Sequence, residues 1–253
     1  TCTHTSLNKW DGILVCRDCD ARLNDTPEAR DKYKDRIADE EEKERNTPPD
    51  LEHESKSIGQ LSQERGVSIE FLLMLTVKYG MFDWTAHDVI RRIVKPATEA
   101  RRCRFVELIE MQDHVGPATT FISYAQSGKW GDLVAAILCD GKADLKRYIW
   151  LDVFAVRQWP SETPDLDFAS TIEHCSSFMV VCSHQQAVED MDNADFVTGK
   201  TEKLPKEVRV QICFFRVWCL VEAHKACTMP EMPFILRVGS YKISENGDIS
   251  FQN

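Results

Sequence analysis

Hydrophobic residues change their spacing near residue 100, from a helical period to short unbroken runs. Before that point, four apolar residues recur at positions that share one face of a helix: Ile69, Leu72, Leu73 and Val77. A second helix is expected to begin after Thr85, whose side chain can cap it, and to end at Pro96. The segment 57–110 is therefore predicted to be an accessory helical layer.

After residue 100 the runs are rich in β-branched and aromatic residues, which is typical of strands buried on both faces. Five such runs occur, at 104–109, 119–124, 147–153, 177–183 and 233–238. Helical patterns fall between them, at about 130–141, 166–176 and 213–227. Strands that alternate with helices imply right-handed crossovers, and Asn246-Gly247 between two further runs predicts a hairpin. Residues 111–253 are therefore predicted to be an α/β domain with a short, doubly wound parallel sheet.

The first 56 residues show no pattern that would bury a core. Residues 25–56 are rich in charge, which predicts a solvated helix or a linker. Residues 1–24 hold two chelating pairs that together supply the four ligands of a closed tetrahedral zinc site: Cys2-x-His4 and Cys16-x-x-Cys19. The alternative is four unrelated residues in a leader segment. The pairing favours a knuckle that resembles a zinc ribbon, with structural zinc, because no coordination position stays open for a substrate.

Composition excludes some classes of protein. The chain is 43% hydrophobic and 28% charged, which is typical of a folded chain, and its net charge of -10 makes nucleic acid an unexpected partner. No run of 18 apolar residues occurs, so no membrane span is expected. Seven of the ten cysteines lie singly within the α/β pattern, which favours reduced thiols and a cytoplasmic location over a secreted disulfide framework. No Gly-x-Gly-x-x-Gly motif follows a predicted strand, which disfavours a dehydrogenase.

Ligands of an open parallel sheet collect outside the carboxyl ends of its strands. The candidate residues follow the predicted strands or lie on the last helix: Ser123, Tyr124, Asp152, Arg157, Trp159, Trp218 and Glu222. Ser123 lacks a neighbouring His-acid pair that would make it a nucleophile. Asp152 can face a ligand or cap the sheet end by accepting backbone N–H bonds. Trp218 fits the core better than a ligand contact, and Glu222 fits the surface of a helix that buries Phe215, Trp218, Cys219 and Leu220.

Five segments resemble, in family order, the strands and one helix of the Toll/interleukin-1 receptor (TIR) domain family. They are Phe121–Tyr124, Tyr148–Asp152, Phe178–Ser183, the helix motif Trp218-Cys219-x-x-Glu222, and Pro233–Leu236. Three further segments are similar to elements of TIR-like proteins of algae and other protists: Lys95–Thr98, Val115–Thr119 and Asp152–Trp159. The likeness covers about half of the chain.

The resemblance implies a flavodoxin-like sheet and one of two functions. Members of the family either signal by assembling with other TIR domains or cleave the nicotinamide glycosidic bond of NAD, with a glutamate at the position that Glu222 matches. It therefore implies Glu222 as the catalytic residue, NAD as the substrate, a homo-oligomer and a role in signalling or defence. Family enzymes often carry a basic residue after the first strand, where this chain has Ala125-Gln126. Arg157 could then hold phosphate and Trp159 could stack on a ring. The second hypothesis is a non-enzymatic assembly module, and a pocket beside Glu222 would favour the first.

Overall fold

The chain forms two compact units, Thr1–Pro49 and Asp50–Asn253. The computed structural model describes residues 61–140, 144–159, 165, 167–183, 206–244 and 246–252, together with the backbone of three strands nearer the amino terminus. These three strands belong to the first unit and pair antiparallel in the order β1-β2-β3: β1 (Leu7–Trp10), β2 (Ile13–Cys16) and β3 (Arg22–Leu23). The predicted zinc ligands Cys2, His4 and Cys19, and the side chain of Cys16, lie outside the described residues.

The second unit is built on a seven-stranded mixed sheet in the order β10-β9-β8-β6-β7-β4-β5. Its strands are β4 (Gly66–Ser68), β5 (Val115–Gly116), β6 (Thr120–Tyr124), β7 (Tyr148–Trp150), β8 (Ser177–Ser183), β9 (Phe234–Ile243) and β10 (Ile249–Gln252). In the part of this unit that the structure describes, the α-helices are α3 (Ile69–Tyr79), α4 (Ala86–Val89), α5 (Lys95–Thr98), α6 (Trp130–Leu138), α7 (Asp152–Ala155), α8 (Phe168–His174), α11 (Lys206–Arg209) and α12 (Val217–Cys227). None of the helices in the described ranges combines the length and apolar character needed to cross a bilayer.

The four central strands run parallel, as the sequence predicts. β6 pairs in parallel with both β7 and β8, and β8 pairs in parallel with β9. The chain therefore starts in the middle of these four, goes to one side for β7, and returns past β6 to β8 and β9. β10 and β4 join antiparallel at either side, so the whole sheet is mixed. The predicted hairpin joins β9 to β10, with Gly247 at a φ of 84° that favours glycine.

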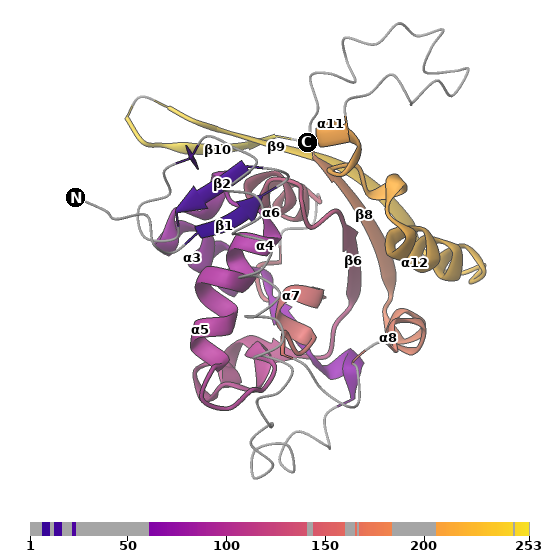
Figure 1. Cartoon of the computed structure of the whole chain (residues 1–253). Coiled ribbons are helices and arrows are strands. Elements are labelled where there is room, and N and C mark those ends of the chain that lie inside the picture. Colours follow the sequence, from indigo (N-terminus) through magenta and orange to yellow (C-terminus); the bar gives the residue numbers. More distant parts are fainter. Residues whose placement is uncertain are drawn as a thin grey trace, which may run out of the picture. The chain divides into compact units, whose positions relative to one another are not determined.

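Helices cover both faces of the central strands. Ile122 and Met179 belong to a core shared with α3 and α6, whereas Phe121 and Phe178 belong to a core shared with α8 and α12. This division follows from the alternation of side chains along a strand. Figure 1 shows α8 and α12 on one side of β6 and β8, with α3, α4 and α7 on the other. β9 approaches α6 so closely that a Cβ added to Gly239 would lie 1.9 Å from a backbone oxygen.

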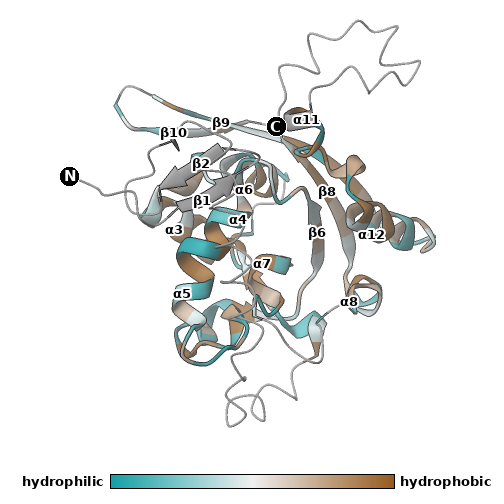
Figure 2. Cartoon of the chain, in the orientation of Figure 1, coloured by the Kyte–Doolittle hydropathy of each residue, from teal (hydrophilic) through white to brown (hydrophobic). Residues whose placement is uncertain are grey.

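The predicted helix after Thr85 forms, but Pro96 does not end it. The Thr85 side chain accepts a hydrogen bond from the backbone N–H of Asp88, which caps α4. The helix then continues through a π-helical turn, η3 (Ile90–Val94), into α5. Pro96 is the second residue of α5 and directly follows the π-helical turn, which ends with the Lys95 N–H bonded to the Ile90 carbonyl oxygen. Hydrophobic and hydrophilic residues alternate along this run (Figure 2).

Two other features of the segment before residue 115 differ from the prediction. Residues 104–109 were expected to form a strand but form 3₁₀ turns, η4 (Phe105–Glu107) and η5 (Ile109–His114). The Glu107 carboxylate accepts a hydrogen bond of 2.8 Å from the Arg104 N–H, which favours a turn over a strand ladder. Strand β4 was not predicted, and it pairs with β7. One core cluster runs from Val67 to Val181, so the helical segment and the α/β sheet share a core. The other 3₁₀ turns within the described residues are η1 (Ser62–Glu64), η2 (Met81–Asp83) and η7 (Cys213–Phe215).

Candidate functional site

A pocket of about 290 Å³ opens at the carboxyl ends of β6 and β7, beside the first turn of α12. Its polar lining comes from three places: Tyr124 and Gln126 at the end of β6, Asp152 and Gln158 after β7, and Arg216 and Glu222 just before and within the first half of α12. Three further rings line it, those of Trp150, Phe168 and Trp218. This is the edge of the sheet at which parallel strands present ligand sites. Four of the predicted site residues thus meet at one cavity.

Glu222 is partly buried in this pocket and is held by Ser123. The Ser123 hydroxyl donates a hydrogen bond of 2.6 Å to the Oε2 atom of Glu222. Burial raises the pKa of Glu222 to about 7, with a smaller contribution from the negative charge of Asp152; the Ser123 hydrogen bond and the Arg216 cation act in the opposite direction. Near neutral pH the carboxyl group therefore populates both protonation states. Carboxyl groups with raised pKa values in a cleft are typical of functional sites.

Asp152 is fixed by three donors. Its Oδ1 atom accepts from the Tyr124 hydroxyl at 2.7 Å and from the Val153 N–H at 2.8 Å, and its Oδ2 atom accepts from the Gln126 side chain at 2.5 Å. Burial raises the pKa of Tyr124 well above its ordinary value, so the phenol stays protonated and continues to donate. Asp152 therefore accepts a backbone N–H bond and also lines the pocket.

Trp218 is not a core residue, contrary to the prediction. Its side chain is 52% exposed, lines the pocket, and meets the Phe168 ring edge-on at a centroid distance of 6.0 Å. Phe215 and Leu220 are also 43% and 47% exposed, although both were expected to be buried. α12 buries the small residues Cys219 and Ala226 instead, so the large side chains at its start remain outside. Figure 2 shows this hydrophobic start of α12.

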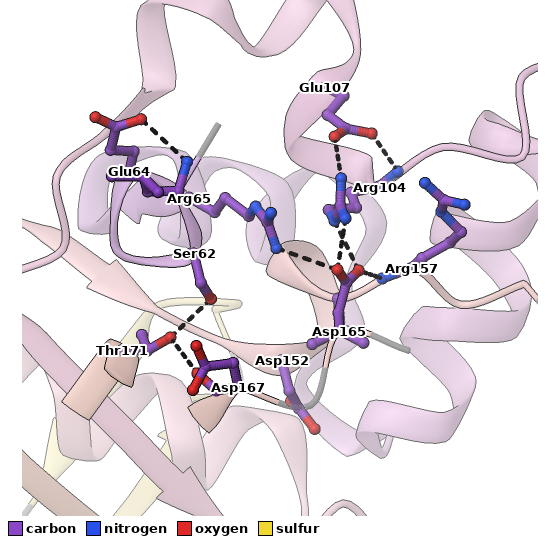
Figure 3. A network of polar contacts seen from close by, with 12 residues as sticks. Ser62, Glu64, Arg65, Arg104, Glu107, Asp152, Arg157, Asp165, Asp167 and Thr171 are labelled. Atoms are coloured by element: carbon purple, nitrogen blue, oxygen red, sulfur yellow. Dashed lines mark hydrogen bonds and ion pairs between the residues drawn. The ribbon is translucent and has the colours of Figure 1, made fainter. Parts of the chain in front are cut away.

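Arg157 and Trp159 do not line the pocket. The Arg157 N–H donates a hydrogen bond of 3.0 Å to the Oδ2 atom of Asp165, and Figure 3 shows its guanidinium directed away from Asp152. The Trp159 indole N–H donates to the Thr98 hydroxyl at 2.9 Å, and the Arg102 guanidinium lies 3.8 Å from the ring centroid. Trp159 therefore attaches the loop after β7 to the helical segment, with a cation–π contact to Arg102, whereas the Arg157 backbone binds Asp165 within the same loop.

The sequence did not point to Arg216, which is the cation among the described lining residues. Arg216 immediately precedes α12, and its charge lowers the pKa of Glu222. Its position one residue before a helix matches no ligand-binding motif. Arg216 therefore occupies the place beside the catalytic candidate that the sequence assigned to Arg157.

Asp165 lies at the centre of a buried charge network that holds the loop after β7 (Figure 3). Its carboxylate accepts hydrogen bonds from Arg104, with Nε at 2.7 Å, from Arg65 at 3.3 Å and from the Arg157 N–H. Arg104 also pairs with Glu107, and the side chains of all four charged residues are 9–11% exposed. Burial is the largest single effect on the pKa of Asp165 and would raise it, but the hydrogen bonds from Arg104 and the Arg157 N–H and the charges of Arg104 and Arg65 together outweigh it, so the pKa lies below its usual value. The network fixes the pocket wall, because Gln158 belongs to the same loop.

No family model, curated protein or solved structure matches the chain. Within the described residues, no group of three or more His, Cys, Asp or Glu side chains could hold a metal ion. The pocket beside Glu222 brings four of the predicted site residues together with a carboxyl group of raised pKa.

Proposed function

We propose that this chain is a TIR-like protein that hydrolyses NAD at the bond between nicotinamide and ribose, with Glu222 as the catalytic residue. The observation that carries the proposal is that Glu222 and Trp218 face a cavity together, rather than lying on a filled helix surface. The order β7-β6-β8-β9 is also the order of a flavodoxin-like sheet, which the TIR resemblance implies. The cavity supports the enzymatic hypothesis over a surface role for Glu222, whereas the strand order supports the TIR-like fold that both hypotheses share.

The chemistry needs a negative charge beside the ribose. When the glycosidic bond breaks, its electron pair moves to the pyridinium nitrogen, which neutralises the nicotinamide ring and leaves positive charge on ribose C1′. The Glu222 carboxylate stabilises this charge and can accept a hydrogen bond from a ribose hydroxyl. Water then adds to C1′ and loses its proton to solvent, which gives nicotinamide and ADP-ribose. The leaving group departs as a neutral ring, so the reaction requires no general acid.

The dimensions and lining of the pocket suit the nicotinamide riboside half of the substrate. A volume of about 290 Å³ is at the lower end of the range for small-molecule sites. The exposed face of Trp218 offers a stacking surface for the nicotinamide ring. Asp152, with both oxygens engaged, positions the ends of β6 and β7 instead of acting as a base. The pyrophosphate would extend past Arg216, whose cation lies at the pocket wall.

The decisive experiment is incubation of the purified full chain with NAD while nicotinamide and ADP-ribose are measured by liquid chromatography. We expect equimolar release of both products, with a specific rate that rises with protein concentration, because family enzymes are commonly activated by association. Absence of release at every concentration would overturn the proposal.

Arg216→Gln is expected to raise the NAD concentration required for half-maximal rate by about tenfold, the loss of one charge-assisted contact. A contact made equally in the ground and transition states changes KM more than kcat. KM of wild type and of Arg216→Gln should be compared at pH 9. Arg216 also lowers the pKa of Glu222, and at pH 9 Glu222 is ionised in both proteins, so a difference in its protonation does not affect the comparison.

Arg157→Gln is the matched control and should leave KM within twofold of wild type, a difference too small to correspond to a lost contact. A larger effect at Arg157 than at Arg216 would return the phosphate-binding role to Arg157.

A second function, a non-enzymatic assembly module, is favoured by the apolar side chains at the start of α12. Five large hydrophobic residues in η7 and the first half of α12 are 42–74% exposed: Phe214, Phe215, Val217, Leu220 and Val221. Exposed apolar side chains that gather in one part of a protein surface are typical of interaction sites. If light scattering shows that the chain forms homo-oligomers and no nicotinamide is released, the assembly-module hypothesis explains the protein better than the enzymatic one.

For the amino-terminal unit we propose a structural zinc ion held by Cys2, His4, Cys16 and Cys19. Metal analysis of the purified chain is expected to give stoichiometric zinc, which the double variant Cys16→Ser/Cys19→Ser should lose because half of the ligands are gone. Cys139→Ser, which alters a partly exposed thiol in the second unit, is the control and should retain the metal. Zinc that persists in the double variant would contradict this ligand set.

A further inference from the structure

Two thiols lie against each other where β8 meets the turn that leads into α12. The Sγ atoms of Cys182, near the end of β8, and Cys213, the first residue of η7, are 3.2 Å apart. Both are free thiols in the structure. Cys213 is fully buried, whereas Cys182 is partly exposed. Formation of a disulfide would require the sulfurs to approach by only about 1.2 Å, to the ordinary bond length of about 2.05 Å.

We propose that Cys182 and Cys213 form a reversible dithiol–disulfide pair, a modification site that hydroperoxides oxidise, with Cys182 attacked first and Cys213 as the resolving thiol. Redox-sensitive cysteines are accessible and lie next to a second thiol that completes the disulfide. Cys182 is accessible because it is partly exposed. Cys213 can complete the disulfide because its Sγ atom lies 3.2 Å from that of Cys182.

The hydrogen bond between the two thiols supports this order of events. It lowers the pKa of Cys182, although burial of that thiol opposes the effect. The same hydrogen bond, together with burial, raises the pKa of Cys213. The thiolate is the nucleophilic form of cysteine, so the first of the two sulfurs to react is the one that ionises more readily and that solvent can reach.

The oxidation balances with hydrogen peroxide as the oxidant. The Cys182 thiolate attacks one peroxide oxygen, the O–O bond breaks, and the Cys182 sulfenic acid forms; the other oxygen leaves and is protonated to water. The Cys213 sulfur then attacks the sulfenic sulfur, the S–O bond breaks, and the S–S bond forms, while the leaving hydroxyl takes the Cys213 proton and departs as a second water. Two thiols are oxidised by two electrons in total, and one peroxide is reduced to two waters.

The disulfide would join β8 to η7 covalently. η7 ends at Phe215, and the next residue, Arg216, lines the pocket and precedes α12. Oxidation therefore fixes the segment from which Arg216 and Trp218 enter the pocket. This inference stands on the thiol geometry and does not depend on NAD being the substrate.

Peptide mapping of the oxidised wild-type chain tests the proposal. The purified full chain is treated with a small excess of hydrogen peroxide, its remaining thiols are blocked with iodoacetamide, and it is digested without reductant for mass spectrometry. We expect a cross-linked peptide that joins Cys182 to Cys213 and that dithiothreitol separates. The exposed thiol of Cys227 is the internal control and should be recovered blocked by iodoacetamide. Recovery of Cys182 and Cys213 each blocked singly, or a cross-link from Cys182 to Cys219 instead, would overturn it.

Two single variants separate the roles of the thiols. Cys213→Ser should stop the reaction at the Cys182 sulfenic acid, which dimedone traps. Cys182→Ser should leave Cys213 unmodified by peroxide, because the buried thiol has no accessible partner. Cys182 is partly exposed, so its serine variant tests the proposal even if Cys213→Ser fails to fold. Peroxide oxidation of Cys213 in the Cys182→Ser protein would overturn the assigned order.

Oxidation of the wild type should also raise its midpoint of thermal unfolding by several degrees, because the disulfide closes a loop of about 30 residues.

Discussion

Glu222→Gln is expected to lower the rate of nicotinamide release by about 10² or more, the effect of removing one group that stabilises charge in a transition state. Glutamine keeps the shape of the side chain and can still accept the hydrogen bond that Ser123 donates to Oε2. It removes the negative charge opposite ribose C1′. Rates of wild type and variant are compared at pH 8, where Glu222 is mainly ionised. Equal rates would show that another group carries the reaction.

The pH dependence gives an independent check on this role. The pKa of Glu222 is about 7, so the wild-type kcat/KM should rise as pH increases through 7 and then level off. The variant has no proton to lose at this position, and its low rate should not follow the same curve. A wild-type rate that falls over this interval would mean that the protonated carboxyl group is the active form.

Stability measurements show whether the variant is folded. The pKa of Glu222 is raised in the folded chain above its ordinary value of 4.5, so wild type loses stability as pH rises from about 4.5 to about 7. Glutamine does not ionise, so the variant does not lose stability in this way. Glu222→Gln should therefore unfold at no lower temperature than wild type at pH 8, and the difference should shrink as the pH approaches 4.5.

The central strands could be predicted because a strand that is buried on both faces appears in the sequence as a short unbroken run of hydrophobic residues. Phe121 and Ile122 enter different cores from adjacent positions, and Phe178 and Met179 repeat the pattern on β8. The three residues of β4 are too few for any period. The path of the helix through Pro96 depends on the π-helical turn before it, which no residue pattern specifies.

The site could be predicted only as far as topology decides it. Tyr124 and Asp152 meet because parallel strands bring their carboxyl ends to one edge. Arg157 could not be placed, because the course of its loop depends on Asp165 binding Arg104, 61 positions earlier in the sequence. The exposure of Trp218 could not be foreseen either, since it depends on α12 packing through its small residues.

Asp165→Asn is expected to destabilise the folded chain by about 3–5 kcal/mol, the cost of breaking a buried ion pair from one side. Arg104 and Arg65 would keep their positive charges in a setting where their side chains are 9–10% exposed. One oxygen of the carboxylate would become an amide N–H group facing a guanidinium donor, which leaves donors unpaired. Urea unfolding at pH 7 measures the change, as a lower midpoint with an unchanged slope.

Asp167→Asn makes the same chemical change two residues away and serves as the control for Asp165→Asn. Asp167 caps α8 by accepting the Ser170 N–H at 3.2 Å, and asparagine caps a helix as well as aspartate does. Its stability should therefore stay within about 0.5 kcal/mol of wild type.

The pKa of Asp165 lies below its usual value, so the contribution of the Asp165 charge to folding stability is present above the unfolded-state pKa and is lost as pH falls through the folded-state pKa. The difference in the free energy of unfolding between wild type and Asp165→Asn should therefore become smaller below about pH 4. A gap that stays constant down to pH 2, or an equal loss in both variants, would show that the charge of Asp165 does not hold this loop in place.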